Sequence, residues 1–183
     1  IAFQNKDELN ALALNSYSCK VFIETIDIDH LENIKRFDPH GLILRGNEAS
    51  GRVSKFTSLM LLQWFLKHTS YPVFIHGGVG MYNAAGILLA GASGFVLNDQ
   101  LALSNESPWS ASYKKLISGL EEKDTMVLGE CLTTKYRVFS KLGTKITSEL
   151  KAKESRHYLK EQDRYDLEND LKNHLSRVDE PCD

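Results

Sequence analysis

Three segments between Gly41 and Ser107 decide the fold of this chain. They read GLILRGNEASGR (residues 41–52), PVFIHGGVG (72–80) and GFVLNDQLALSNES (94–107). In each segment, a short apolar run bounded by Gly or Pro is followed by a polar turn. This is typical of a buried parallel strand whose carboxyl end opens into a loop. The intervening residues 56–68 and 82–90 have apolar positions at helical spacing, so the pattern predicts consecutive βα units.

The sequence predicts four strands, each followed by a helix. The expected strands are residues 20–25, 41–45, 73–76 and 94–98, and the expected helices are 30–37, 59–68, 82–90 and 109–120. Residues 46–55 are expected to form a loop. The expected N-caps are Asp27 or Asp29 and Thr57 or Ser58, and Gly91 is the expected C-cap. Loops at the carboxyl ends of parallel strands share one face, which holds the functional site in such folds.

The composition is that of an ordinary globular domain. The 183 residues carry a formal net charge of −2, with 42% hydrophobic and 25% charged residues. The strand-rich part has no basic stripe, and no apolar run approaches membrane-spanning length, so neither nucleic acid nor a membrane is an expected partner. The three scattered cysteines (Cys19, Cys131, Cys182) indicate reduced thiols in the cytosol. The first residue is Ile1, and we expect the chain to be a piece of a larger protein.

The composition changes after Gly119. Residues 125–129 and 136–140 are expected to form short strands of a small appendage spanning 121–143. From Thr144 the chain is highly charged and almost free of Gly and Pro. Residues 144–183 therefore suggest a solvated helical linker, or alternatively a helix that docks on a neighbouring domain.

The loops after the predicted strands supply the candidate functional residues. Gly77 and Gly78 follow a buried strand, where two glycines let the backbone approach an anion, although glycines also end strands for steric reasons. His76 ends the same strand and should point toward the mouth of the site or into the core. Two further polar clusters are expected on the same face: Glu48, Ser50, Gly51 and Arg52, and then Asn98, Asp99 and Gln100.

These motifs resemble the nitronate monooxygenase family, also called 2-nitropropane dioxygenase-like, which includes the FMN-dependent enoyl reductases of fatty-acid synthesis. The resemblance rests on N-E-A-S-G-R, P-V-F-I-H-G-G-V-G and A-G-A-S-G-F-V-L-N-D-Q-L-A-L-S-N-E-S, and it covers roughly residues 20–140. The variant G-N-E-A-x-G-R, with L-L-Q in the next helix and E-K-D-T-M-V-L-G-E and Y-R-V-F further on, is closer still to members built into polyketide and polyunsaturated-fatty-acid synthases.

The resemblance implies a TIM (β/α)8 barrel that binds FMN at the carboxyl ends of its strands. Residues 1–120 would be the C-terminal half of that barrel, strands five to eight. The FMN phosphate would lie on Gly77 and Gly78 and on the turn of Asn98 and Asp99. His76 and the backbone of Ser50 and Gly51 would line the flavin. Candidates for apolar side chains facing the barrel interior are Val73, Ile75, Val96 and Leu97.

Two departures from the family pattern concern the site. Arg52 occupies the place of the family's His, which serves as a catalytic base or a gate. A guanidinium stays protonated and cannot be a general base, but it could bind the phosphopantetheine of an acyl carrier or stabilise an enolate oxyanion. Asn98 and Asp99 stand where the family has Gly-Thr, and a carboxylate facing a phosphate repels it unless it turns away. The candidate catalytic residues are Arg52 and His76.

The resemblance thus implies part of a cytoplasmic FMN-dependent oxidoreductase that acts on an acyl thioester or a nitronate. The expected activity is reduction of an enoyl thioester, with NAD(P)H as a possible reductant and with acyl carrier and synthase domains as possible partners. The alternative is a degenerate, non-catalytic barrel kept as a structural or docking module. Arg52, Asn98 and Asp99 favour the alternative, whereas the glycine pair, Glu48 and Ser107 favour the enzyme.

Overall fold

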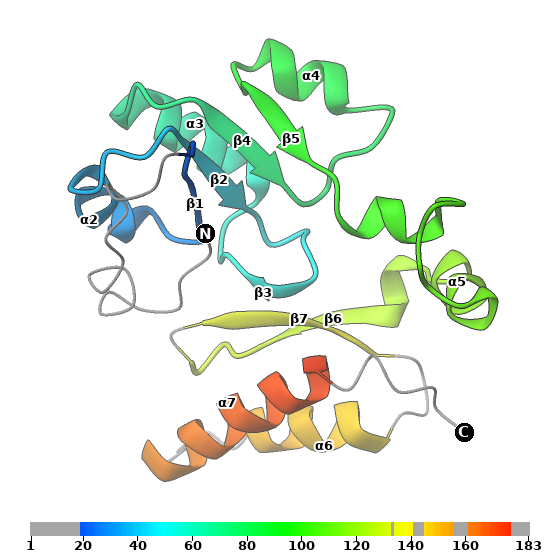
Figure 1. Ribbon diagram of the computed structural model, residues 1–183. Coiled ribbons are helices and arrows are strands. Elements are labelled where there is room, and N and C mark those ends of the chain that lie inside the picture. The colour runs from blue at the N-terminus through cyan, green and yellow to red at the C-terminus, as the bar shows by residue number, and fades with distance from the viewer. Residues whose placement is uncertain (1–18, 133, 141–144, 156–160, 177–183) are drawn as a thin grey trace. The chain divides into compact units, whose positions relative to one another are not determined.

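The computed structural model describes residues 19–132, 134–140, 145–155 and 161–176 (Figure 1). The chain divides into two compact units, and each is described by itself. The first unit comprises Ile1–Ala49 and Val53–Leu97, and the second comprises Ser50–Arg52 and Asn98–Asp183. Within the described part of the chain, no helix is long and apolar enough to cross a membrane.

The first unit is a parallel α/β sheet. Its strand order is β1 (Phe22–Thr25), β2 (Gly41–Arg45), β4 (Val73–His76) and β5 (Gly94–Val96), and every adjacent pair is parallel. Its helices are η2 (Ile28–His30), α2 (Leu31–Lys35), α3 (Ser58–His68) and α4 (Ala84–Leu89). The strands lie in the sheet in their order along the chain, which is the order found in a (β/α)8 barrel. The predicted βα units are confirmed, and β2 and β4 have the predicted bounds.

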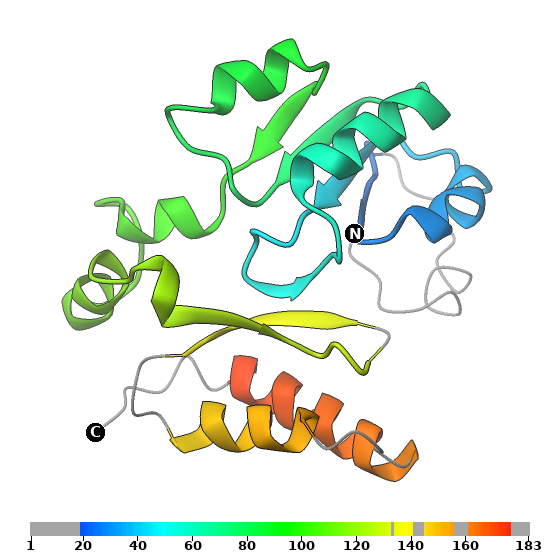
Figure 2. The same ribbon diagram turned by 180° about the vertical axis from the view of Figure 1, so that it is seen from behind.

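One face of this sheet carries the hydrophobic core. Alternate strand residues point to the same face, and the fully buried ones belong to this set: Ile23, Leu42, Leu44, Val73 and Ile75. They share a cluster with Leu61, Leu62 and Phe65 of α3, which lies in front of the sheet in Figure 2. Burial of these eight side chains stabilises the folded state by about 1.5–3 kcal/mol each, which offsets conformational entropy. Because three of the eight belong to α3, this helix holds the covered face of the sheet in place.

The opposite face of the sheet is only half covered. It carries Phe22, Ile43 and Phe74, all partly exposed, and the rings of Phe22 and Phe74 meet edge to face with centroids 5.4 Å apart. A Cβ at Gly41 would lie 2.8 Å from the Phe22 ring, so the glycine makes room for that ring. This is the face that would look into a closed barrel.

Two of the four apolar side chains that were expected to face the barrel interior lie on the other face of the sheet. Val73 and Ile75 are each 1% exposed and pack in the core that α3 covers. Because strand side chains alternate, an error of one position reverses the face. Val96 is half-buried, and Leu97 is exposed beyond the end of β5.

The expected helix boundaries are confirmed where a cap defines them. The side chain of Thr57 accepts a hydrogen bond from the Met60 N–H at the start of α3, and Asp27 caps η2 by accepting from the Asp29 N–H. Gly91 follows α4 with φ of +104°, a conformation that glycine adopts without strain.

Elsewhere the boundaries differ from expectation. Residues 46–55 are not only a loop, because they contain the strand β3 (Gly51–Val53). The helix expected at 82–90 is limited to α4, and the strand expected at 94–98 ends at Val96. α5 (Ala111–Ser118) starts two residues after the expected Trp109, because the Ser110 side chain accepts from the Tyr113 N–H and so sets the cap.

The second unit combines a three-stranded sheet with two charged helices. The strand order is β3, β7 (Lys135–Phe139) and β6 (Thr125–Leu128), and β6 pairs antiparallel with β7. The unit also contains η3 (Asp99–Leu103), η4 (Glu122–Asp124), α6 (Lys145–Glu154) and α7 (Glu161–Ser176). Both α6 and α7 lie on one face of the β6–β7 hairpin (Figures 1 and 2). The two short strands expected in the appendage are confirmed.

The described part of the charged tail is not a solvated linker. Leu150 of α6 and Leu167 and Leu171 of α7 are at most 4% exposed and share a core with Leu128, Tyr136 and Val138. The appendage and the tail, expected as separate segments meeting at residue 144, therefore fold as one unit. The average composition concealed this, because a narrow leucine stripe on an otherwise charged helix is enough to bury one face. Residues 156–160 and 177–183 of the tail lie outside the described residues.

Candidate functional site

Three ionisable side chains meet at the carboxyl end of the parallel sheet. His76 Nδ1 lies 2.6 Å from Glu24 Oε1, and Arg45 Nη1 lies 3.5 Å from the same oxygen. Glu24 pairs with Ile43 in the strand register, and Arg45 pairs with His76. All three therefore project from the half-covered face, on three adjacent strands.

The protonation of this cluster follows from its surroundings. Burial by itself would raise the pKa of Glu24, but the hydrogen bond from His76 and the positive charge of Arg45 outweigh it and lower the pKa below its ordinary value. Glu24 is consequently a carboxylate at neutral pH and only accepts hydrogen bonds. His76 Nδ1 must then be the donor, and it carries a proton.

The other ring nitrogen of His76 is the distinctive atom of the site. His76 is 7% exposed, and its Nε2 is buried without a hydrogen-bond partner among the described residues. Leaving a buried polar atom unpaired costs about 1–3 kcal/mol, so such atoms are few in native proteins and each requires an explanation, of which a catalytic role is one. In the neutral ring, Nε2 is a hydrogen-bond and proton acceptor.

We expect Glu24→Gln to destabilise the protein at neutral pH and to matter less in acid. The pKa of Glu24 is lowered from 4.5 in the folded state, so its stabilising charge is fully present above pH 4.5 and is lost as the pH falls through the folded-state pKa. Thermal melts at pH 7 and pH 3.5 measure the difference between wild type and variant. The matched control is Glu32→Gln, whose side chain is 78% exposed. If wild type exceeded the variant in melting temperature by the same amount at pH 3.5 as at pH 7, the stabilisation would not come from the charge of Glu24.

The glycine pair after β4 packs against the loop that follows β2. Gly77 and Gly78 have φ of +104° and +68°, and a Cβ on Gly77 would lie 2.6 Å from the Ala49 backbone nitrogen. A Cβ on Gly78 would lie 3.0 Å from the Glu48 side chain. Close packing against Ala49 is thus enough to explain why position 77 is a glycine. The contact of this turn with a phosphate stays a prediction.

Glu48 has a structural partner in this arrangement. Its carboxylate accepts a 2.9 Å hydrogen bond from the backbone N–H of Ser58 at the first turn of α3, where an anion also interacts favourably with the helix dipole. Ser58 Oγ lies 2.9 Å from Glu48 Oε2 and 3.0 Å from the Gly77 carbonyl oxygen, so its single proton serves one of these acceptors. Glu48 thereby connects the loop, the helix and the glycine turn.

The remaining candidates belong to the second unit. Ser50 precedes β3, and Gly51 and Arg52 lie in it. Burial and the charge of Glu168 raise the pKa of Tyr136, and the charges of Lys172 and Arg52 oppose this rise. Asn98 and Asp99 stand at the start of η3, where the Asn98 N–H donates to Gln100 Oε1.

The structure thus brings together some candidates and not others. His76 and the two glycines share the first unit, whereas Arg52 and the Asn98–Asp99 turn fall in the second. Sequence reasoning missed Glu24 and Arg45. The available signal was a charged residue within each of two mainly apolar strands, FIET and GLILR, but only the register shows that the two face the same histidine.

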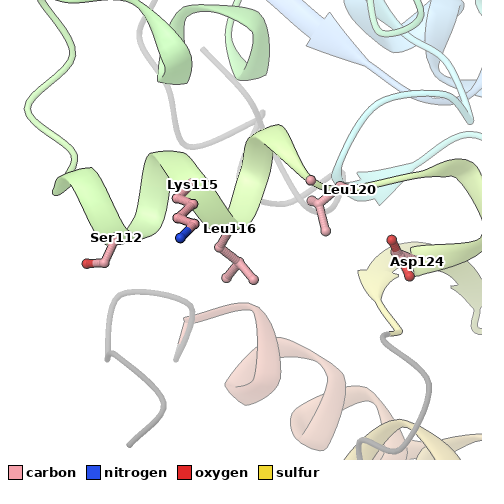
Figure 3. Close-up of a pocket in the computed structure, with 6 residues that line it drawn as sticks. Ser112, Lys115, Leu116, Leu120 and Asp124 are labelled. Carbon is pink, nitrogen blue, oxygen red and sulfur yellow. The ribbon is translucent and has the colours of Figure 1, made fainter.

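A separate hollow of about 350 Å³ lies beside α5 in the second unit (Figure 3). It is lined by Ser112, Lys115, Leu116, Gly119, Leu120 and Asp124. It contains none of the residues singled out in the sequence. Among the residues that the structure describes, no group of three or more His, Cys, Asp or Glu side chains is placed to hold a metal ion.

Comparison with known proteins shows the fold through solved structures. No protein-family model and no curated protein matches the chain. The structure is similar to FabK from Thermotoga maritima, with a TM-score of 0.77 and 21% identity over 97% of this chain and 54% of FabK. It is also similar to nitroalkane oxidase from Streptomyces ansochromogenes, with a TM-score of 0.62 and 15% identity over 96% of this chain and 52% of the oxidase. The chain therefore spans about half the length of these solved structures, and the likeness shows an α/β fold with a parallel sheet.

Proposed function

We propose that this chain is part of an FMN-dependent oxidoreductase of the nitronate monooxygenase or enoyl reductase type. The observation that carries the proposal is the buried, unpartnered Nε2 of His76 at the carboxyl end of a parallel sheet, the position of the active site in barrels. The structural likeness to FabK and to a nitroalkane oxidase supports this class, as does the order of the three sequence motifs.

The residues of the first unit are compatible with a polar cofactor. His76 offers an unsatisfied acceptor, and Gly77 and Gly78 bring backbone close to the same sheet end. In this proposal the glycine turn contributes to the FMN phosphate site, and His76 lines the flavin. Bound FMN would supply hydride transfer, while these residues would orient the flavin and exclude water from it. The proposed substrate is an acyl thioester or a small nitronate-type compound, with NAD(P)H as reductant for a thioester and a polyketide or fatty-acid-type synthase as context.

A second candidate function is a non-catalytic barrel module. Arg52 favours it, because it replaces a histidine at the position that the resemblance makes catalytic and lies in β3, where its charge acts on Tyr136 and Lys172. Glu48, which the sequence alone counts in favour of the enzyme, supports this alternative instead, because its carboxylate is occupied at the start of α3. In this alternative the second unit would serve as a docking element for neighbouring synthase domains.

Flavin binding separates the two functions. We expect a protein that contains this chain together with a completing half-barrel to retain FMN through gel filtration and to oxidise NAD(P)H with a crotonyl thioester. The isolated 183 residues should bind FMN weakly and lack this activity, because a (β/α)8 site draws residues from the ends of many strands. Absorbance near 450 nm and NADPH consumption measure both. A completed barrel that retains no flavin would favour the non-catalytic module.

A further inference from the structure

We propose that Glu24 is a positioning residue that holds His76 with its proton on Nδ1, so that Nε2 accepts a donor hydrogen from the ligand of this site. This inference rests on the proposed function for the identity of the ligand, but the protonation of His76 does not depend on it. It makes His76, and not residue 52, the proton-accepting side chain of the site.

The contact with Glu24 decides which ring nitrogen is protonated. The 2.6 Å approach of Nδ1 to Oε1 is a charge-assisted hydrogen bond, and the lowered pKa of Glu24 keeps its carboxylate ionised. An ionised carboxylate has no proton to donate. Neutral His76 must therefore carry its proton on Nδ1, which leaves a lone pair on Nε2.

Arg45 keeps the carboxylate in place. Its Nη1 lies 3.5 Å from the oxygen that His76 contacts, and strand pairing sets Arg45 directly beside His76. Glu24 on β1 contacts Arg45 on the neighbouring β2 and reaches across β2 to His76 on β4. Two contacts on one oxygen restrict the carboxylate, and the imidazole ring orientation is restricted with it.

When the ring of His76 is neutral, the missing partner of Nε2 is a donor. Burial of Nε2 without a partner is unfavourable, and a lone pair is satisfied only by N–H, O–H or an acidic C–H. Two sources fit the proposed function: the ring N–H or ribityl hydroxyls of the flavin, and the acidic hydrogen beside the electron-withdrawing group of a substrate. In the second case, the proton passes to Nε2 and the electron pair stays on the substrate as a delocalised anion, while Glu24 faces the imidazolium formed.

The first test measures the tautomer directly. In the 183-residue chain labelled with ¹⁵N-histidine, the His76 resonances are identified by their loss in His76→Gln. We expect a protonated Nδ1 and an unprotonated Nε2 at neutral pH. Glu24→Gln should shift the proton toward Nε2 in a large fraction of molecules, because a carboxamide can also donate to Nδ1. Glu24→Asp should retain the wild-type tautomer, and Glu32→Gln on α2 is the matched control.

The second test identifies the donor. FMN and nitroethane are added separately to the labelled chain, at millimolar concentration because weak binding is expected. A change in the Nε2 shift with FMN alone assigns the donor to the cofactor, and a change with nitroethane assigns it to the substrate. Glu24→Gln should lower the affinity for whichever ligand changes the Nε2 shift by about tenfold, the equivalent of one hydrogen bond to a buried group. The circular dichroism spectrum should stay unchanged.

Failure of this inference is distinguishable from failure of the proposed function. A wild-type His76 protonated on Nε2, or an Nε2 shift that neither ligand changes, would overturn the inference even if a completed barrel retains flavin. Conversely, a completed barrel that binds no FMN would contradict the proposed function but not this inference. The inference would then be supported by the expected tautomer of His76 together with a change of the Nε2 shift on addition of nitroethane.

Discussion

Gly77→Ala is expected to lower the free energy of unfolding of the first unit by about 2–5 kcal/mol. The backbone of Gly77 has φ of +104°, which costs a residue with a Cβ about 1–2 kcal/mol. In addition, the new methyl would lie 2.6 Å from the Ala49 nitrogen and 2.8 Å from the Ala49 Cβ. These neighbours are backbone or tightly attached to it, and overpacking of this kind costs about 1–3 kcal/mol.

The same turn supplies the control. Gly80 has no atom within 4 Å of an added Cβ and no positive φ, so Gly80→Ala should change stability by less than about 0.5 kcal/mol. Trp64 of α3 packs against the core of the first unit, and its fluorescence in a Trp109→Phe background reports urea unfolding of that unit. Equal midpoints for the two alanine variants would show that Gly77 tolerates a side chain and would leave a ligand contact as its explanation.

The parts of the fold that sequence reasoning predicted well are those fixed by local chemistry. β2 and β4 lie between glycine or proline and polar turns, and Thr57 and Gly91 mark helix ends with cap geometry that depends on a few neighbouring residues. The short β3 could not be predicted, because its three residues, Gly51–Val53, are strand only through pairing with β7. That pairing links residues about 85 positions apart, and no local pattern encodes it.

The candidate site illustrates the same division. His76 was identifiable because it ends an apolar strand and precedes two glycines. Its partner Glu24 was not, because the contact joins residues 52 positions apart and requires the register of three strands. The face on which Val73 and Ile75 lie was missed for a related reason. Alternation is visible in a sequence, but which of the two alternating sets meets α3 depends on packing.

Leu171→Ala is expected to lower the free energy of unfolding of the second unit by about 2–5 kcal/mol, the usual cost of this truncation in a packed core. Leu171 of α7 is fully buried and shares a core with Leu128, Tyr136 and Val138. A solvated linker would lose nothing by the same change, so the variant distinguishes the two descriptions of the tail. For a unit of this size, the loss corresponds to a fall in melting temperature of about 10 °C or more.

The control for Leu171→Ala makes the same substitution at an exposed helical position. Leu116 of α5 is 43% exposed, and Leu116→Ala should change stability by less than about 1 kcal/mol. Hydrogen exchange of the β6 and β7 amides localises the effect, because these strands form the sheet that α6 and α7 cover. Loss of Leu171 should accelerate their exchange by roughly 30-fold or more, as about 2 kcal/mol requires. Unchanged exchange in β6 and β7 would show that α7 is not needed to hold this hairpin.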